Sequence, residues 1–455
     1  MVAYILFQLL RGFVLFVICY VVIMGGIKVL QMIFALFISS VNFSKNRNFG
    51  FSRLGVPGNQ IPFSLLVPAF NEEETIVDSV KSMLNINYAN YEIVIINDGS
   101  TDKTLASLIN AFSLNKISYP VRERLATKRV KGIYCNPDIP RLRLIDKENG
   151  GKSDALNAGI NLSFYPYIVS LGADSLLEAD VLSRIAAAFI QNKYTVAVGG
   201  AARACNGCTV ADGKVQSVGL PKNIWALFQI VEYLHSFLAG RIGWSSVNSL
   251  LIVSGAFGAF QKEAVLSVGG FSVGMAGEDM DLVIKLHRYM RSKKYKYRVS
   301  FIPDPVFRKM APESLAVLSN QCRHHQIRLM NVLGSNRDMI LNPRFGMLGM
   351  LAMPYYFLFE MLSPIIELSG YILIPIAWYF ELLSLDAMIL FYAAAFLFGS
   401  VASVGSLIIE EITGTKYIKV KDVLVLGFMS IAENIFFRQL TALFRLTGFF
   451  TYRRK

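Results

Sequence analysis

Cysteine is scarce in this chain, which has five cysteines among 455 residues. So few thiols do not form a disulfide framework, and they fit a reducing compartment. Two of them make Cys205-Asn-Gly-Cys208, a single CxxC without the second pair that a four-cysteine zinc site would need. We therefore expect a glycine-containing turn at this position rather than a zinc or redox site.

Glycine motifs that cradle phosphates are missing. The sequence contains neither GxGxxG nor GxxxxGK[ST], which excludes a dinucleotide fingerprint and a Walker-type loop. Acidic residues are also in deficit, with 32 Asp and Glu against 45 Lys and Arg, a net charge of +13. No motif supports nucleic-acid binding as the reason for this charge.

The chain has few long polar stretches near its two ends, and its overall composition is apolar. Hydrophobic residues make up 54% of the sequence, and the mean hydropathy is +0.45, too apolar for a wholly soluble protein. In a membrane protein, excess Lys and Arg are typical of cytoplasmic surfaces that face anionic lipid.

One apolar stretch, residues 12–40, contains a single charge, Lys28. It exceeds the about 20 residues that span a bilayer, so we expect a tilted helix or one that continues into the interface. A cleaved signal peptide is the alternative, but the stretch is too long for one and lacks an A-x-A-like end. The basic residues that follow place this side in the cytoplasm: Lys45, Arg47 and Arg53.

The chain becomes apolar again after residue 345. We expect an interfacial helix over 345–354, membrane spans over 357–380 and 388–409, and a charge-interrupted segment at the interface over 423–450. Glu360 and Glu367 are seven residues apart and share one helix face. Acids at membrane depth usually face a cavity or a partner, and a pair near the headgroups fits equally well.

Between these ends, the stretch from Leu65 to Asp102 predicts strand, turn, helix, loop and strand. Residues 65–67 are a short apolar run that Pro68 ends, and residues 92–96 are a second. Parallel strands joined by a helix end at the same edge of a sheet, so residues 69–73 and 97–102 should lie side by side there. Acceptors such as Glu72 and Asp98 suit sugar hydroxyls and the amide edge of a nucleobase.

VPAFNEE and IVIINDGSTD resemble the opening motifs of the family 2 glycosyltransferases. The resemblance implies an α/β fold, a GT-A (Rossmann-like nucleotide-sugar) domain inserted between transmembrane helices. It also implies that Asp98 contacts the uridine of a nucleotide sugar, with further nucleotide-sugar contacts from Ala69, Asn71 and Glu72.

A glycine turn leads into Lys152 in the stretch KENGGKSDALN. Its glycines let the backbone approach a ligand, and the lysine adds a point charge suited to a phosphate. The stretch resembles the family's GKxxALN element, so Lys152 would line the nucleotide pocket. A flexible turn with a solvated lysine is the alternative.

Asp174 lies in Gly172-Ala-Asp-Ser, after an expected strand over 167–171. Family members carry DxD here, and the last Asp holds Mg²⁺ or Mn²⁺ on the diphosphate. Asp174 takes that place, while Gly172 replaces the first Asp. Mg²⁺ often uses only one or two carboxylates plus phosphate and water, so metal binding through Asp174 remains physically reasonable.

Gly277-Glu-Asp-Met-Asp281 matches the family's TED motif, with Gly277 for Thr. The resemblance makes Asp279 the general base that deprotonates the acceptor hydroxyl, a group that inverting transfer requires. Glu278 is the second candidate, because adjacent carboxylates can raise one pKa at the other's expense. An acidic helix N-terminus is the structural alternative.

Gln321-Cys-Arg-His-His stands where processive family members have QxxRW. Gln321 matches, His324 stands for Arg and His325 for Trp. Mostly neutral imidazoles supply less charge to a diphosphate than an arginine does, and Arg323 is a substitute cation. We expect these four residues at the acceptor and diphosphate site.

The predicted domains are an N-terminal transmembrane helix over 1–41, a cytosolic GT-A domain over 42–342, and membrane and interfacial helices over 343–455. The resemblance implies an inverting hexosyltransferase of the hyaluronan, chitin, cellulose or poly-N-acetylglucosamine synthase type. It would use a UDP-sugar and Mg²⁺ or Mn²⁺ to extend a polysaccharide coupled to export, as a multi-pass protein of the inner (plasma) membrane.

Two alternatives stay open at this point. One is a single-transfer enzyme acting on a lipid or lipid-linked acceptor, and the other is a non-catalytic sugar-nucleotide-binding subunit. The expected partners are the donor, a glycan or lipid-linked acceptor, membrane lipids and, in an export system, accessory subunits, with no nucleic acid.

Overall fold

The computed structural model describes residues 2–48, 60–211, 214–255, 257–412 and 420–452. The chain forms two compact units. The sheet unit comprises Asn42–Gly219 and Trp244–Met310, and the helical unit comprises Met1–Val41, Leu220–Gly243 and Ala311–Lys455.

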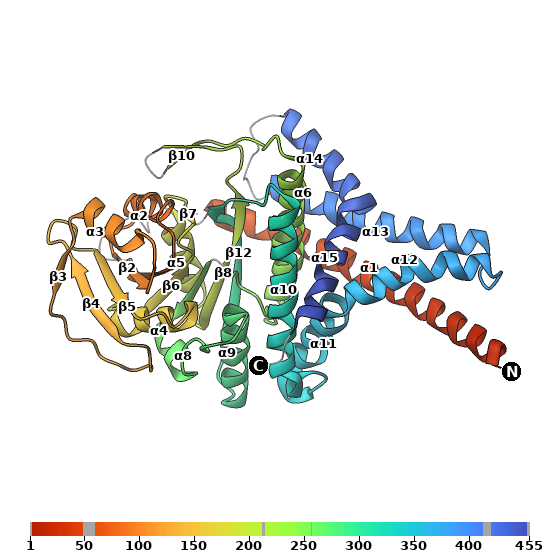
Figure 1. Cartoon of the computed structure of the whole chain (residues 1–455), viewed down its shortest axis with the longest axis horizontal. Helices are drawn as coiled ribbons and strands as arrows, with labels where there is room; N and C mark the ends of the chain where they lie inside the picture. The colour runs from red at the N-terminus through yellow and green to blue at the C-terminus, as the bar shows by residue number, and fades with distance from the viewer. Residues whose placement is uncertain (1, 49–59, 212–213, 256, 413–419, 453–455) are drawn as a thin grey trace. The chain divides into compact units, whose positions relative to one another are not determined.

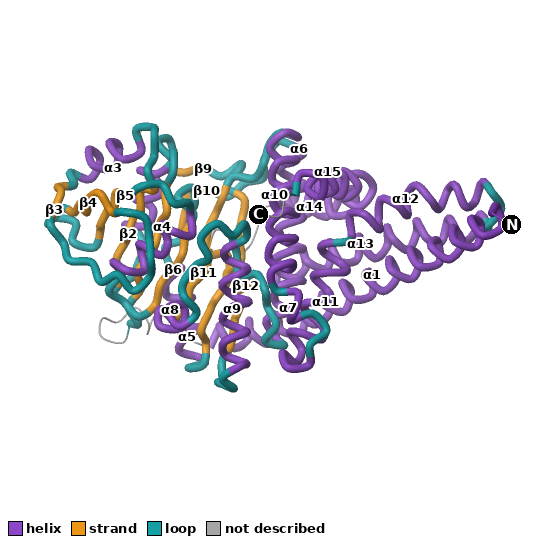
Figure 2. Tube along the Cα trace, turned by 60° about the horizontal axis from the view of Figure 1, so that its bottom comes forward, coloured by secondary structure: helices purple, strands orange, loops and turns teal. Residues whose placement is uncertain are grey.

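A ten-stranded mixed sheet forms the centre of the sheet unit, in the order β3-β4-β5-β2-β1-β6-β11-β8-β12-β7 (Figures 1 and 2). Strands β1, β2, β5 and β6 are parallel neighbours, whereas β11 pairs antiparallel with β6 and β8. The strands are β1 Phe63–Ala69, β2 Tyr91–Asp98, β3 Asn115–Ile117, β4 Val130–Cys135, β5 Leu142–Lys147, β6 Tyr167–Leu171, β7 Leu176–Leu177, β8 Thr195–Ala204, β11 Phe257–Gln261 and β12 Arg298–Lys309. A separate antiparallel pair, β9 Thr209–Ala211 and β10 Lys214–Ser217, completes the strands.

The first two strands are buried along almost their whole length, as expected for parallel strands covered on both faces. Helix α4 (Lys152–Leu162) packs on β1 and β2. Gly159 permits this approach, because a Cβ there would lie 2.9 Å from Ile96 Cδ1. The other helices of this unit are α2 Ile76–Leu84, α3 Thr104–Phe112, α5 Val181–Gln191, α7 Ile242–Ser246, α8 Lys262–Ser267 and α9 Glu278–Ser292.

The predicted meeting of residues 69–73 with 97–102 is confirmed. The backbone N–H of Asn71 donates to Ser100 Oγ at 3.1 Å, and that of Glu72 donates to Thr104 Oγ1 at 2.8 Å. The register of β1 and β2 brings this about, because it places Ala69 opposite Asn97 at the ends of both strands.

The CxxC forms the expected turn after β8. The backbone N–H of Cys208 donates to the Cys205 carbonyl at 3.0 Å, and Gly207 takes φ +83°, a conformation that favours glycine. Both cysteines are free thiols.

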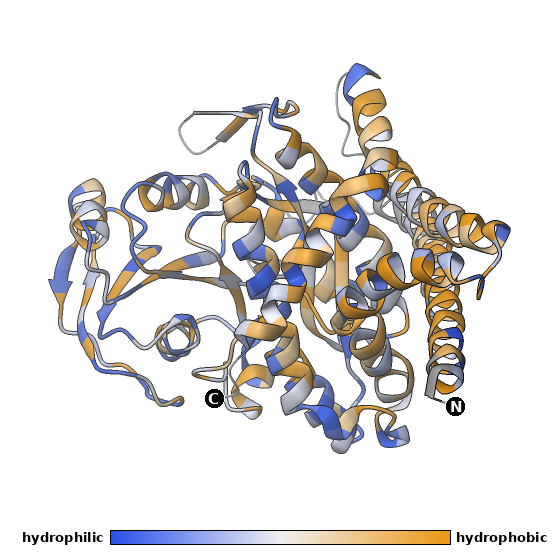
Figure 3. Cartoon of the chain, turned by 45° about the vertical axis from the view of Figure 1, so that its right-hand side comes forward, coloured by the Kyte–Doolittle hydropathy of each residue, from blue (hydrophilic) through white to orange (hydrophobic). Residues whose placement is uncertain are grey.

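The helical unit is built on three apolar helices, α1 Val2–Asn48, α12 Ser363–Tyr379 and α13 Leu385–Ile412. Figure 3 shows apolar residues dominating the helix that carries the N-terminus. The remaining elements are α6 Ile224–Leu234, η2 His235–Arg241, α10 Leu315–Ser335, η3 Arg337–Met339, η4 Pro343–Phe345, η5 Leu348–Ala352, α11 Met353–Tyr355, η6 Tyr356–Met361, α14 Val420–Ala432, η7 Glu433–Phe437 and α15 Arg438–Thr451.

Two helical segments in the described parts of the chain, Phe7–Ser40 and Leu385–Ile412, are long and apolar enough to cross a membrane. A third candidate is the pair Leu348–Met361 and Ser363–Tyr379, which is bent by 47°. Pro364 accounts for the bend, because proline lacks an N–H and its ring clashes with the carbonyl four residues earlier. That carbonyl, of Glu360, instead accepts a hydrogen bond from Arg445 Nη2.

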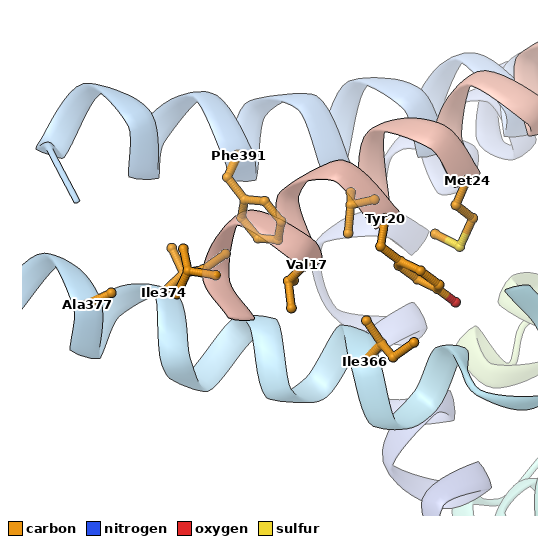
Figure 4. Packing of buried hydrophobic residues seen from close by; sticks show 9 residues of the cluster. Val17, Tyr20, Met24, Ile366, Ile374, Ala377 and Phe391 are labelled. Atoms are coloured by element: carbon orange, nitrogen blue, oxygen red, sulfur yellow. The ribbon is translucent and has the colours of Figure 1, made fainter. Parts of the chain in front are cut away.

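The three apolar helices pack through a cluster of buried side chains (Figure 4), which includes Val17, Tyr20, Met24, Ile366, Ile374, Ala377 and Phe391. Gly370 lets α12 approach α1 closely, since a Cβ there would lie 2.6 Å from Val17 Cγ1. The Tyr20 hydroxyl donates to the Leu358 carbonyl at 2.7 Å, so the buried phenol is satisfied.

Candidate active site

Asp98, the last residue of β2, is 3% exposed and accepts three hydrogen bonds. Its Oδ1 accepts from Lys147 Nζ at 2.6 Å and from the N–H of Gly150 at 3.0 Å, and its Oδ2 accepts from the N–H of Gly151 at 2.7 Å. The register of β2 and β5 explains the contact, because it places Asp98 opposite Lys147. Asp98 therefore fixes the glycine turn that leads into α4.

Lys147 is fully buried between two carboxylates and was not among the predicted site residues. Its Nζ lies 2.6 Å from Asp98 Oδ1 and 2.6 Å from Asp154 Oδ1. A buried lysine needs such partners, because an unpaired buried charge is strongly destabilising. The sequence signal was available: a lysine at the end of an apolar strand, seven residues before an acid in the first turn of the next helix.

The predicted donor-side residues at the end of β1 hold the neighbouring loop. Asn71, at φ +56°, accepts at Oδ1 from the N–H of Thr101 at 2.8 Å. The half-buried Glu72 accepts from Thr75 Oγ1 at 2.8 Å. Ala69 is 1% exposed and contributes its backbone to this edge.

Lys152, Glu278 and Asp279 come together at the N-termini of α4 and α9. Lys152 Nζ lies 2.5 Å from Glu278 Oε1 and 2.9 Å from Asp279 Oδ2, and it donates to the Gly255 carbonyl at 2.9 Å. Gly277, at φ +95°, starts α9 and sets both acids in its first turn. The sequence indicated all three residues separately but gave no sign that they meet.

Electrostatics makes Asp279 suited to accept a proton near neutral pH. Burial raises the pKa of Asp279 to about 7, the adjacent Glu278 adds to the rise, and Lys152 opposes it. Burial disfavours the charge on Lys152, but the Asp279 and Glu278 carboxylates outweigh it and raise the pKa of Lys152. One lysine thus forms ion pairs with two acids, and the raised pKa of Asp279 lets it hold a proton near neutral pH.

Asp174 lies beyond β6 and pairs with Lys309, with 2.8 Å between its Oδ2 and Nζ. Both side chains are partly exposed, at 35% and 42%. The hydroxyl of the neighbouring Ser175 is buried and has no hydrogen-bond partner among the described residues. Within the same residues, no group of three or more His, Cys, Asp or Glu could hold a metal. A divalent ion at Asp174 would therefore take its remaining ligands from a bound diphosphate and water.

The predicted acceptor and diphosphate residues lie on α10, in the helical unit. Gln321, His324 and His325 are exposed, and Arg323 Nη2 donates to Asn320 Oδ1 at 2.8 Å. Gln326, which the sequence did not single out, is fully buried: its Nε2 donates to the Met361 carbonyl at 2.9 Å and its Oε1 accepts from Arg445 Nε at 3.0 Å. Gln326 thereby fixes α10 to the rest of this unit.

Two models of known protein families match the sequence. Residues 64–227 match the model for glycosyl transferase family 2, and residues 167–400, more than half of the chain, match that for glycosyl transferase family group 2. The chain belongs to the family 2 glycosyltransferases. The predicted family and enzyme class are confirmed, and Asp98, Lys152, Asp174 and Asp279 all lie within the matched ranges.

The curated relatives of this family 2 glycosyltransferase include synthases of poly-beta-1,6-N-acetyl-D-glucosamine. It is 28% identical over 259 residues to the Staphylococcus epidermidis enzyme, across 57% of this chain and 52% of the relative. It is 29% identical over 306 residues to the enzyme of Staphylococcus aureus (strain COL), across 67% and 63%. The chain thus spans less than two thirds of the length of these relatives.

A solved structure confirms the fold of this glycosyltransferase. The mannosyltransferase PcManGT from Pyrobaculum calidifontis, in complex with GDP-Man and Mn²⁺, aligns with a TM-score of 0.51 at 16% identity. The alignment covers 91% of this chain and 99% of that one. The predicted α/β GT-A architecture is therefore confirmed.

Proposed function

We propose that this glycosyltransferase moves a sugar from a UDP-sugar to a growing polysaccharide with inversion at C1. The observation that carries the proposal is the pairing of Asp279, with its pKa of about 7, and Lys152 at the glycine turn. The relatives add support, because both are polysaccharide synthases. Their product makes N-acetylglucosamine the first sugar to test.

Asp279 acts as the general base. The acceptor oxygen bonds to C1 of the sugar as the bond from C1 to the diphosphate oxygen breaks, and the hydroxyl proton passes to the Asp279 carboxylate. A base with a pKa near the working pH is deprotonated often enough to accept that proton and basic enough to hold it. Glu278 shares Lys152 and balances its charge while Asp279 is protonated.

Lys152 links donor binding to the base. It is 35% exposed, so an arriving diphosphate can reach its ammonium. Transfer of Lys152 from the carboxylates to the phosphates would remove a cation that lowers the pKa of Asp279, making the base stronger when the donor is present.

Nucleotide and acceptor contacts complete the proposal. The edge formed by Ala69, Asn71, Glu72 and Asp98 takes the nucleotide, and Asp98 acts there largely by holding the glycine turn. The α10 residues Gln321, Arg323, His324 and His325 take the acceptor or the diphosphate.

Asp174 would hold Mg²⁺ or Mn²⁺ together with the diphosphate. Such an ion supplies positive charge that stabilises the departing diphosphate. An arriving divalent ion would replace the ammonium of Lys309, which pairs with this carboxylate.

The membrane arrangement follows the charge distribution. Basic residues after the first span favour a cytoplasmic catalytic domain over 42–342, flanked by membrane segments over 1–41 and 343–455 in the inner (plasma) membrane. The candidate spans support a multi-pass topology, with export of the product coupled to synthesis and, where present, aided by accessory subunits.

The deciding experiment supplies the full-length protein in lipid with labelled UDP-sugars and Mg²⁺ or Mn²⁺, and then sizes the product. A high-mass polymer from UDP-N-acetylglucosamine supports the proposal. Absence of transfer from every UDP-sugar contradicts it and favours a non-catalytic sugar-nucleotide-binding subunit.

A second candidate is a single transfer to a lipid or lipid-linked acceptor. Gly172 in place of the first DxD acid, and His324 and His325 in place of the QxxRW pair, favour it, because processive family members carry a carboxylate, a permanent cation and an indole at these positions. A lipid-soluble product carrying one sugar would identify this activity in the same assay.

A further inference from the structure

The turn after β8 carries two free thiols, Cys205 and Cys208, which the proposed function does not use. Cys205 is buried, at 8% exposed, whereas Cys208 is half-buried. The residues on either side of Cys208, Gly207 and Thr209, are exposed. A reagent in solution can therefore reach Cys208, while the chain shields Cys205.

The turn holds the two cysteines at a separation that a disulfide can bridge. The N–H of Cys208 donates to the Cys205 carbonyl at 3.0 Å. This hydrogen bond closes a β-turn, in which the Cα atoms of the first and fourth residues lie within about 7 Å of each other. Disulfides join Cα atoms that are about 4.4–6.8 Å apart. The two side chains are also hydrogen-bonded to each other, so a disulfide would need little movement of the backbone.

Two contacts fix the turn within the sheet unit. The N–H of Cys205 donates to the Lys309 carbonyl at 2.9 Å, which continues the pairing of β8 with β12. Gly219 packs against the turn, since a Cβ there would lie 2.8 Å from the Gly207 carbonyl oxygen. The folded sheet thus keeps the two thiols in place.

Hydrogen-bond donors surround the Cys208 sulfur. The Cys205 thiol and the Gly219 N–H both donate to it, and Arg308 Nη1 donates at 3.8 Å. Glu178 shares the guanidinium, because it accepts from Arg308 Nε at 2.8 Å. Together these donors, with the Cys205 thiol first among them, hold the pKa of Cys208 below its ordinary value although burial opposes them. The accessible sulfur is therefore the one that favours a thiolate.

The two cysteines are suited to different steps of an exchange reaction. The hydrogen bond to Cys208 and burial raise the pKa of Cys205, so Cys205 stays a thiol while Cys208 is a thiolate. In thiol–disulfide exchange the thiolate is the nucleophile, and it needs access to the reagent. Cys208 meets both conditions for the first attack, and Cys205 lies in position for the second.

A zinc site fits these thiols less well. Structural zinc takes four ligands. In the described ranges, no group of three or more His, Cys, Asp or Glu could hold a metal. The positive charge of Arg308 at Cys208 Sγ also disfavours a second cation there. The structure thus adds to the expected turn an environment that suits exchange chemistry better than metal binding.

We propose that Cys208 and Cys205 form a reversible disulfide by exchange with a low-molecular-weight disulfide, for which oxidised glutathione is the probe. The Cys208 thiolate bonds to one sulfur of the reagent, the S–S bond of the reagent breaks, and the first glutathione leaves as a thiolate. Cys205 then bonds to Cys208 Sγ, and the second glutathione leaves with the proton of Cys205. The protein thiols lose two electrons, which the reagent gains. The proposed glycosyl transfer is not needed for this reaction.

The test incubates the full-length protein in detergent with glutathione buffers of increasing oxidised share. Iodoacetamide then blocks the free thiols, and tryptic peptides are weighed without reduction. Cleavage after Arg203 and Lys214 gives one peptide, 204–214, that contains both cysteines. As the oxidised share rises, this peptide should lose both alkyl groups and appear two hydrogens lighter than the free dithiol, and reduced glutathione should reverse the change. Cys135, the other half-buried thiol, is the matched control and should stay alkylated.

Two variants separate the roles of the sulfurs. Cys205→Ser should accumulate a glutathione adduct on Cys208, because the second thiol is gone. Cys208→Ser should leave the buried Cys205 without an adduct. In the wild type at pH 7, iodoacetamide should modify Cys208 roughly tenfold faster than Cys135, because the thiolate is the reactive form.

Three results would overturn the proposal. One is a peptide 204–214 that stays fully alkylated in oxidised glutathione alone. Another is an adduct on Cys135 as readily as on Cys208, which would mean unselective oxidation of accessible thiols. The third is equal adduct formation in Cys205→Ser and Cys208→Ser, which would remove the assigned roles. If either variant does not stay monodisperse, the wild-type peptide and the alkylation rates decide the question. Because no nucleotide sugar is present, this outcome is independent of the transfer assay.

Discussion

The two units balance their buried charges in different ways. In the sheet unit, each of two lysines forms ion pairs with two carboxylates. Lys147 pairs with Asp98 and Asp154. Lys152 pairs with Glu278 and Asp279. In the helical unit, the carboxylate of Glu367 pairs with a single cation, Arg438. The excess in the sheet unit is negative and is relieved when Asp279 keeps a proton. The Glu367–Arg438 pair of the helical unit is neutral.

The largest expected effect comes from removing the base. Asp279→Asn should lower transfer by about 10²- to 10⁴-fold, because general base catalysis contributes that much, while nucleotide binding persists. Asp281→Asn is the matched control two residues further along α9, because its side chain can still accept the hydrogen bond from Ser272 Oγ. The measurement is the rate of labelled sugar incorporation, and full activity in Asp279→Asn would refute the assignment.

Lys147→Met should lower the free energy of unfolding by an amount comparable to the activation free energy lost in Asp279→Asn. It leaves Asp98 and Asp154 as uncompensated buried carboxylates, which should cost about 3–5 kcal/mol. Hydrogen exchange of the β2 amides in the full chain measures this loss. The control Lys81→Met breaks an exposed pair with Asp78 and should cost less than about 1 kcal/mol. Equal protection in the two variants would mean that the buried pairing does not hold this edge.

In the sheet unit, the titration of two buried groups should change stability with pH in opposite directions, so that their effects nearly cancel. His287 is fully buried between the Tyr297 hydroxyl and the Leu250 carbonyl, and burial lowers its pKa to about 4. Its contribution is complete above pH 6.5 and is lost as the pH falls toward 4, about 2 kcal/mol by pH 5. Asp279 acts in the opposite direction, because its raised pKa adds stability as the pH falls from about 7.

Asp279→Asn should therefore unmask the acid sensitivity. Between pH 7 and pH 5, hydrogen exchange should show the variant losing about 2 kcal/mol more than the wild type, in which the two groups nearly cancel. Parallel curves for the two proteins would contradict the titration of Asp279 in this range.

The pH dependence of transfer provides a smaller but more specific test. In the wild type, kcat/KM should rise with pH and level off near pH 7, where Asp279 becomes deprotonated. Lys152→Met should move this inflection to higher pH, because it removes the cation that lowers the pKa of Asp279, whereas Lys152→Arg should preserve it. An inflection that stays in place in Lys152→Met would show that Lys152 does not act on the base.

The smallest effect is expected where charges meet on the surface. Arg124 pairs with Glu263 at 2.6 Å, but the side chains are 40% and 65% exposed. Arg124→Gln should leave stability almost unchanged, because solvent screens this exposed pair, and hydrogen exchange of α8 measures the effect. A loss comparable to that of Lys147→Met would show that burial is not what distinguishes the two pairs.

By itself, the sequence determined the features that depend on neighbouring residues. The apolar runs before Asn71 and Asp98 predicted two parallel strands, and the topology of a strand-helix-strand unit then required their ends to meet. The same local motifs indicated the family through Asp98, Asp174 and Asp279. The long apolar runs predicted helices long enough to span a membrane, because a bilayer requires a minimum length.

Only the tertiary structure decided which of these groups meet. Lys152 and Asp279 are 127 residues apart, and no local rule predicts that one lysine serves both acids of α9. Lys147, Lys309 and Gln326 were missed because their partners lie on other elements. At the bend before Pro364, the Glu360 carbonyl accepts its hydrogen bond from Arg445 on α15, which the local sequence does not indicate. Charge balance in a low-dielectric interior depends on distances, and these appear only when the chain has folded.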